Sequence, residues 1–331
     1  MFIKVNSLLG CSRRQVYKYL KHLGYTTYKE FMKTTGLYRF HNAEKVITAI
    51  LMMMRYKIRL YTLPPILNDV LVPYPWLLFN IYNVKSVYRY LEAYKEILNI
   101  KPQAILVDVG VTRYWRKSKD KLPVDYDDEF WNLFWSAVDF MKSVYRESGV
   151  PYEIVIPDYP DDYSKHWGCK HALFLEECSN AVTNIDRTIE NIVYIVSQDR
   201  KTRWLLSIQG YEEDPLSLEY ATQELLQLKE CLRVEKYRLA IGNICTSRRA
   251  EMSKTCIEVV RKYVKNFHVF GLSLSGFRKS VRLLEGCSWD SMAWNAARYP
   301  GLGMVQDTEQ KLEYFMAYLT QVYHIMRREL C

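Results

Sequence analysis

The chain has 331 residues, of which 49% are hydrophobic and 25% charged, and it carries a net charge of +9. These fractions exclude a disordered chain, and no apolar run reaches the roughly 18 residues that suggest a membrane span. The start of the chain lacks the layout of a secretion signal, and the eight cysteines are scattered without a Cys-x-x-Cys pair. We therefore expect a cytoplasmic protein with no membrane partner, built from one large domain and one small one.

Nearly all of the excess positive charge lies in the first 60 residues. This stretch holds twelve Lys and Arg against two Asp and Glu, whereas the rest of the chain is close to neutral. A concentrated basic patch is typical of proteins that bind a polyanion. The charge distribution therefore indicates a nucleic-acid partner.

Residues 1–55 are predicted to form a small basic helical domain. Gly10 marks a turn, Ser12 is a good N-cap for the next helix, and Gly24 is a fitting end for it. This punctuation resembles a helix-turn-helix; the alternative is a solvated basic helix packed on the main domain. A further helix is predicted for residues 42–54. In a helix-turn-helix, the second helix would present to nucleic acid Arg13, Arg14, Lys18 and Lys21.

Residues 56–331 are predicted to alternate strands and helices. Strands are expected at 57–62, 76–82, 104–110, 152–158, 204–210, 237–243, 267–273 and 287–291. Several are continuous apolar runs, as in strands covered by helices on both faces. Eight strand–helix units predict an α/β fold, a (β/α)8 barrel. A doubly wound open sheet is the alternative, although no Gly-x-Gly-x-x-Gly follows the early strands. Helical patterns include 85–99, 127–148, 216–232 and 248–265.

The ends of the predicted strands carry acids, an amide and glycines. In a (β/α)8 barrel the active site lies at the carboxyl ends of the strands, so these residues should meet at one mouth. Acids and an amide suit the donor edge of a purine base, and glycines let a flat ligand approach the backbone. The strand-end residues are Asp108, Asp158, Gln209, Gly210, Gly242, Gly271 and Asp290.

These strand ends resemble those of the tRNA-guanine transglycosylase family. Asp108 matches the aspartate of the family's Asp-Ser-Gly-Gly-Phe motif, although here it begins Asp-Val-Gly-Val-Thr. Ser207-Ile-Gln209-Gly210-Tyr211 resembles the Val-Gln-Gly-Gly strand end, and Leu239-Ala-Ile-Gly242-Asn243 resembles the glycine-rich base-binding strand. Asp290-Ser-Met-Ala-Trp294 resembles the Asp-Ser-Ala-Ser-Tyr around the nucleophile. The resemblance covers roughly residues 57 to 300.

The resemblance implies an enzyme that exchanges guanine in a polynucleotide for a 7-deazaguanine base such as 7-cyano-7-deazaguanine. It implies that Asp290 is the nucleophile, giving a covalent glycosyl-enzyme, and that Asp108 is the general acid and base. Asp158 and Gln209 would bind the base edge. The strands at Gly210, Gly242 and Gly271 would complete the base site.

The chain departs from the tRNA enzymes beyond the nucleophile strand. Those enzymes carry a Cys-x-Cys-x-x-Cys and a His that bind zinc, whereas here only His324 and Cys331 come after Asp290. We therefore expect no zinc site and no cofactor, as in the shorter DNA-modifying guanine transglycosylases. Together with the helix-turn-helix-like segment, this departure favours DNA over tRNA as the substrate. A homodimer is compatible with the sequence.

Further basic and aromatic side chains lie near the predicted mouth. Tyr159, Tyr211 or Trp294 could stack on an extruded base, although such residues are more often core. His268, on an apolar strand, is expected to be a satisfied core histidine. His166, Cys169 and His171 lack a fourth ligand, so they do not predict a metal site. Five basic residues could bind phosphates, and the alternative is that they lie in solvated loops. They are Arg113, Arg116, Lys117, Arg248 and Arg249.

Three other functions remain open on the sequence. The same base exchange could act on tRNA. The chain could be a non-catalytic DNA-binding regulator with a degenerate barrel. It could also be a nucleoside hydrolase or ribosyltransferase that acts on small molecules.

Overall fold

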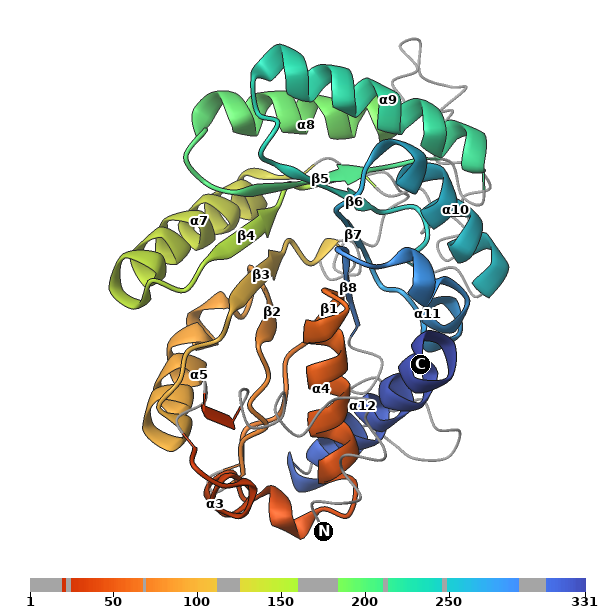
Figure 1. Ribbon diagram of the computed structural model, residues 1–331. Helices are drawn as coiled ribbons and strands as arrows, with labels where there is room; N and C mark the ends of the chain where they lie inside the picture. The colour runs from red at the N-terminus through yellow and green to blue at the C-terminus, as the bar shows by residue number, and fades with distance from the viewer. Residues whose placement is uncertain are drawn as a thin grey trace.

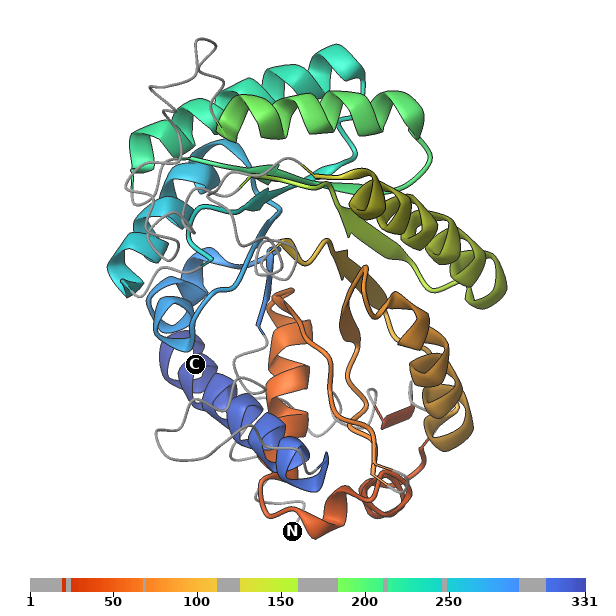
Figure 2. The same ribbon diagram turned by 180° about the vertical axis from the view of Figure 1, so that it is seen from behind.

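Eight parallel strands form a barrel at the centre of the computed structural model (Figures 1 and 2). The strands are β1 Arg59–Tyr61, β2 Trp76–Asn80, β3 Ala104–Asp108, β4 Tyr152–Val155, β5 Trp204–Ile208, β6 Arg238–Ile241, β7 Phe267–Val269 and β8 Ser288–Asp290. The structure describes residues 20–21, 25–67, 70–111, 126–159, 184–210, 214–245, 249–291 and 308–331.

The sheet runs in the order β1-β8-β7-β6-β5-β4-β3-β2. Its two edge strands meet at a parallel bridge between Thr62 and Leu77. Two backbone hydrogen bonds make this contact, from Thr62 N to the Trp76 carbonyl at 3.3 Å and from Leu78 N to the Thr62 carbonyl at 3.0 Å. The predicted (β/α)8 barrel is therefore confirmed, and each of the eight predicted strands is present in a shorter form.

Helices form a ring outside the strands, as both views show (Figures 1 and 2). Four of the predicted helices are present within two residues of their expected bounds, whereas the helix predicted for residues 85–99 is divided into three shorter helical segments between Val84 and Leu98. The α-helices are α3 Tyr28–Thr34, α4 Ala43–Arg55, α5 Val87–Ala93, α7 Asp128–Ser148, α8 Asn184–Gln198, α9 Pro215–Leu232, α10 Ala250–Tyr263, α11 Leu274–Ser280 and α12 Thr308–Leu330. The shorter helical turns are η1 Leu37–Arg39, η2 Val84–Ser86, η3 Tyr94–Leu98 and η5 Val281–Leu283.

Local sequence explains where the outer helices begin. The side chains of Asp127, Asp214 and Ser273 accept backbone N–H bonds of 2.8, 3.0 and 3.1 Å from the first turns of α7, α9 and α11. Each of these caps ends a connection that leaves the carboxyl end of a strand. The helices therefore start on the side of the barrel mouth and run back along the outside of the barrel.

Aromatic side chains hold the helices to the strands. The ring of Trp204 in β5 stacks with Phe134 of α7 at 5.9 Å, and Trp289 in β8 stacks with Phe277 of α11 at 4.3 Å. All four side chains are buried. Burial of a large apolar side chain stabilises the fold by about 1.5–3 kcal/mol, so such pairs help to hold the helices against the strands that carry the site.

The described part of the amino-terminal segment packs against the barrel. Helix α4 lies beside α12 (Figure 1), and the hydroxyl of Tyr56 donates to the carbonyl of Leu330 at 3.0 Å. Most of the predicted helix-turn-helix lies outside the described residues; Leu20 is buried and Lys21 is exposed. Within the described ranges, no helix is both long and apolar enough to cross a membrane.

Candidate active site

Three aspartates lie at the carboxyl ends of strands. Asp108 ends β3, Asp290 ends β8, and Asp158 follows β4. Because all eight strands are parallel, these ends open on the same mouth of the barrel. The carboxylates are close enough to interact, since the charges of Asp290 and Asp158 both raise the pKa of Asp108.

Asp108 is set to exchange a proton near neutral pH. Burial is the largest of the effects that raise its pKa to about 7, followed by the charges of Asp290 and Asp158. The backbone N–H groups of Gly110 and Val109 bond its carboxylate and act in the opposite direction. A carboxyl group with a pKa near the working pH is suited to general acid–base catalysis.

Asp158 and Gln209 form a buried pair. The Nε2 of Gln209 donates to Oδ2 of Asp158, and Gln209 and Asp158 are 2% and 5% exposed, respectively. Burial raises the pKa of Asp158 to about 6, against the effect of the Gln209 hydrogen bond. The Tyr126 hydroxyl fixes the backbone here by donating to the Asp158 carbonyl at 2.6 Å. Two polar side chains are thus held rigidly beside Asp108.

Gln209 keeps one polar atom available. Its Oε1 is buried and accepts no hydrogen bond from any described residue. Buried acceptors are normally satisfied, so this atom is suited to an N–H group brought by a ligand. Gly242 makes room for the amide, because a Cβ at this position would lie 2.1 Å from Gln209 Nε2. The side chain of Gln209 can therefore occupy this position only because residue 242 is a glycine.

Among the described residues, the hydrogen-bond partners of Asp290 all contact one of its two oxygens. Oδ1 accepts a hydrogen bond from Gly271 N at 3.1 Å and lies 3.0 Å from His268 Nε2. Gly271 has a positive φ of 60°, and a Cβ there would lie 2.6 Å from the sulfur of Cys245. Glycine is therefore needed for the turn that brings this N–H to the carboxylate.

His268 is a site residue that the sequence reasoning missed. It is satisfied, as expected of a core histidine, but one of its partners is the candidate nucleophile Asp290. The signal that identifies it is strand register, which the structure shows and the sequence does not. His268 pairs with Ser288 across β7 and β8, and Asp290 is two residues further along β8, on the same face.

Gly210 serves the packing of a helix. A Cβ at this position would lie 2.9 Å from the backbone N of Leu218 in α9. The glycine therefore lets α9 approach the end of β5. Close approach between helix and strand therefore explains the glycine here.

Some of the residues predicted to contact phosphates or the base lie within the described part of the chain, and others do not. Arg249 is exposed at the start of α10, and the ring of Tyr159 is buried, with the Arg187 guanidinium 3.8 Å above it. Tyr159 is therefore a core residue. Within the described ranges no cluster of His, Cys, Asp and Glu could hold a metal ion. Outside the described residues lie Arg13, Arg14, Lys18, Arg113, Arg116, Lys117, His166, Cys169, His171, Tyr211, Arg248 and Trp294.

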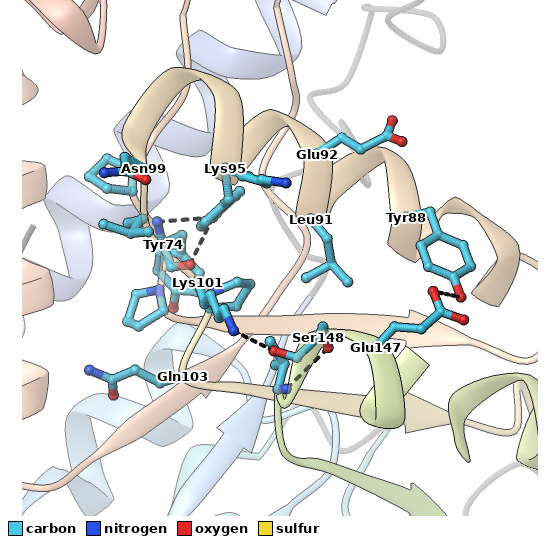
Figure 3. Close-up of a pocket in the computed structure, with 16 residues that line it drawn as sticks. Tyr74, Tyr88, Leu91, Glu92, Lys95, Asn99, Lys101, Gln103, Glu147 and Ser148 are labelled. Atoms are coloured by element: carbon cyan, nitrogen blue, oxygen red, sulfur yellow. Dashed lines mark hydrogen bonds between the residues drawn. The ribbon is translucent and has the colours of Figure 1, made fainter. Parts of the chain in front are cut away.

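A cavity of about 700 Å³ lies at the opposite end of the barrel (Figure 3). It is bordered by residues that precede β2 and β3 and by the end of α7. Some of its polar groups bind neighbouring protein groups: Lys101 Nζ donates to the Ser148 carbonyl at 2.6 Å, and the Tyr88 hydroxyl donates to Glu147 Oε2 at 2.8 Å. The three aspartates do not line it.

No protein-family model, curated protein or solved structure matches this chain. The barrel is thus established by its own strand pairing. The resemblance to guanine transglycosylases rests on the residues at the strand ends.

Proposed function

We propose that the protein is a guanine transglycosylase that exchanges guanine in DNA for a 7-deazaguanine base. The observation that carries the proposal is the pairing, at one mouth, of a carboxylate held through a single oxygen with a second carboxyl group whose pKa is about 7. Retaining glycosyl transfer needs these two roles, a nucleophile and an acid that later acts as a base.

In the first step Asp290 attacks the anomeric carbon of the nucleotide. Its oxygen forms a bond to C1′ as the bond from C1′ to N9 of guanine breaks, and Asp108 gives its proton to the departing base. In the second step the incoming 7-deazaguanine returns a proton to Asp108. Its nitrogen attacks C1′, the ester bond to Asp290 breaks, and the carboxylate is restored.

Asp158 and Gln209 are the residues proposed to bind the base. Guanine presents an N–H and an amino group on one edge, and both are donors. The buried Oε1 of Gln209 and the carboxylate of Asp158 are acceptors on the same side of the mouth. In duplex DNA the target nucleotide must first leave the stack, which costs a few kcal/mol.

The preference for DNA is supported by the basic residues 1–60 and by the missing zinc motif. The test is incorporation of labelled guanine into duplex DNA and, separately, into tRNA. Incorporation into DNA that is lost in Asp290→Ala supports the proposal. Incorporation into tRNA alone would move the substrate to RNA, and tight DNA binding without any exchange would contradict an enzymatic role.

A further inference from the structure

A chain of polar side chains crosses the inside of the barrel and ends at Asp290. Barrel interiors are usually filled by branched apolar side chains. Here Arg238 of β6 donates from Nη1 to Ser288 Oγ of β8 at 2.9 Å and from Nε to Glu153 Oε1 of β4 at 2.8 Å. These strands are not neighbours in the sheet, so the contacts pass through the interior. Ser288 Oγ lies 2.9 Å from His268 Nδ1.

Buried polar groups are costly unless they are fully hydrogen-bonded. His268 and Ser288 have no exposed surface, and the side chains of Arg238 and Glu153 are 10% and 19% exposed. The polar and charged groups facing the imidazole are Asp290 and Ser288 from β8, Arg238 from β6 and Glu153 from β4, and the ring of Tyr61 in β1 packs against it in a T-shaped arrangement. These polar contacts therefore form a continuous network that runs from the interior of the barrel to Asp290 at the mouth.

The chemistry of the partners determines where the imidazole proton lies. Arginine can only donate, so Ser288 Oγ accepts from Arg238 and has its own hydrogen to give. The neighbouring acceptor is His268 Nδ1, which leaves the imidazole proton on Nε2. Burial is the main cause of the lowered pKa of His268, so the ring is neutral at ordinary pH. Its Nε2–H then donates to Oδ1 of Asp290.

We propose that His268, fixed as the Nε2–H tautomer by Arg238 and Ser288, is the positioning residue for the nucleophile Asp290. This role rests on the proposed base exchange. With His268 and Gly271 both on Oδ1, the other oxygen, Oδ2, is the one directed to form the bond to C1′. When that ester bond breaks in the second step, negative charge returns to both oxygens, and the two donors stabilise it on Oδ1.

Two variants of His268 separate positioning from simple packing. His268→Leu keeps an apolar side chain of similar volume but removes the donor. We expect kcat to fall roughly 10- to 100-fold with KM nearly unchanged, because a hydrogen bond to a charged group contributes about that factor. His268→Gln places an amide donor near Asp290 and should restore part of kcat. Equal loss in both variants, or no loss in either, would overturn the proposal.

Ser288→Ala is a milder variant that leaves the imidazole in place. It removes the hydroxyl that fixes the tautomer, so kcat should fall by a smaller factor than in His268→Leu. Thermal unfolding of each variant shows whether it is folded under the conditions of the assay. A Ser288→Ala variant with normal kcat and the wild-type tautomer would contradict the role given to Ser288.

Nitrogen NMR of the free wild-type protein tests the tautomer and the hydrogen bonds of His268 without any substrate. We expect His268 to show a protonated Nε2 and an unprotonated, hydrogen-bonded Nδ1 at neutral pH. The reverse tautomer or an imidazolium would overturn the inference. If the wild type exchanges no base, the proposed function fails and the positioning role fails with it. If the wild type is active and His268→Leu is equally active, the inference alone fails.

Discussion

The two ends of the barrel differ in how their polar groups are satisfied. At the amino-terminal end, the cavity of about 700 Å³ has Lys101, Tyr88 and Glu147 bound to protein partners (Figure 3). At the carboxyl-terminal end, Gln209 holds a buried acceptor without a partner among the described residues, and Asp108 and Asp158 have raised pKa values. Perturbed and unsatisfied groups indicate a functional site better than cavity volume does.

The largest expected difference between the two ends is catalytic. Asp290→Ala should lower guanine exchange by on the order of 10⁴-fold or more, because it removes the nucleophile. The matched change at the other end, Glu147→Ala, should leave exchange unaltered. Incorporation of labelled guanine into duplex DNA measures both. A Glu147→Ala loss comparable to that of Asp290→Ala would reverse the assignment of the site.

Asp108→Asn should lower exchange by about 10²- to 10⁴-fold, since it removes the acid and base. The pH profile sharpens this prediction. Release of the first base requires protonated Asp108, whose pKa is about 7, so wild-type turnover should fall as pH rises above that value. The residual activity of Asp108→Asn should lack this fall. A profile that stays the same in the variant would show that another group donates the proton.

Alanine substitutions at two glycines test whether an added Cβ affects base binding only when the glycine lies at the mouth. Gly242→Ala would place a Cβ 2.1 Å from Gln209 Nε2, so we expect a stability loss of about 1–3 kcal/mol and a raised KM for the base. Gly149→Ala, at the end of α7, has a positive φ of 69° but no atom within 4 Å, so about 1–2 kcal/mol of backbone strain is expected without a kinetic effect. Thermal unfolding and steady-state kinetics distinguish the two. A normal KM in Gly242→Ala would contradict the role of Gln209.

The last expected effect is on the pH dependence of stability. The folded-state pKa of Asp108 is raised from 3.8 to about 7, so the folded protein binds the extra proton between these values. The wild type should therefore lose stability as pH rises through this window. Asp108→Asn cannot ionise and should be more stable by about 1–3 kcal/mol above pH 7, allowing for partial exposure. Urea unfolding should show that the difference in unfolding free energy between Asp108→Asn and the wild type decreases as pH falls toward about 4. A difference that does not change with pH would argue against a raised pKa.

The strands were predictable because apolar runs alternate with helical patterns, but their ends were not. The strand predicted for residues 267–273 ends at Val269, because Gly271 adopts a left-handed conformation. The acids of the mouth were also predictable, since a parallel barrel gathers its strand ends. His268 was not, because its contact with Asp290 depends on the register of β7 against β8, which spacing within one strand does not reveal.

The bridge between Thr62 and Leu77 lies between the strands of Asp290 and Asp108 in the closed barrel. On one side, β1 pairs with β8 and Tyr61 faces Asp290; on the other, β2 pairs with β3 and Asn80 faces Asp108. A short seam has few hydrogen bonds to break, so local opening should begin there. We expect the amides of Thr62 and Leu78 to exchange with deuterium early, in a motion that changes the distance between Asp290 and Asp108 while the remaining strand pairs stay closed.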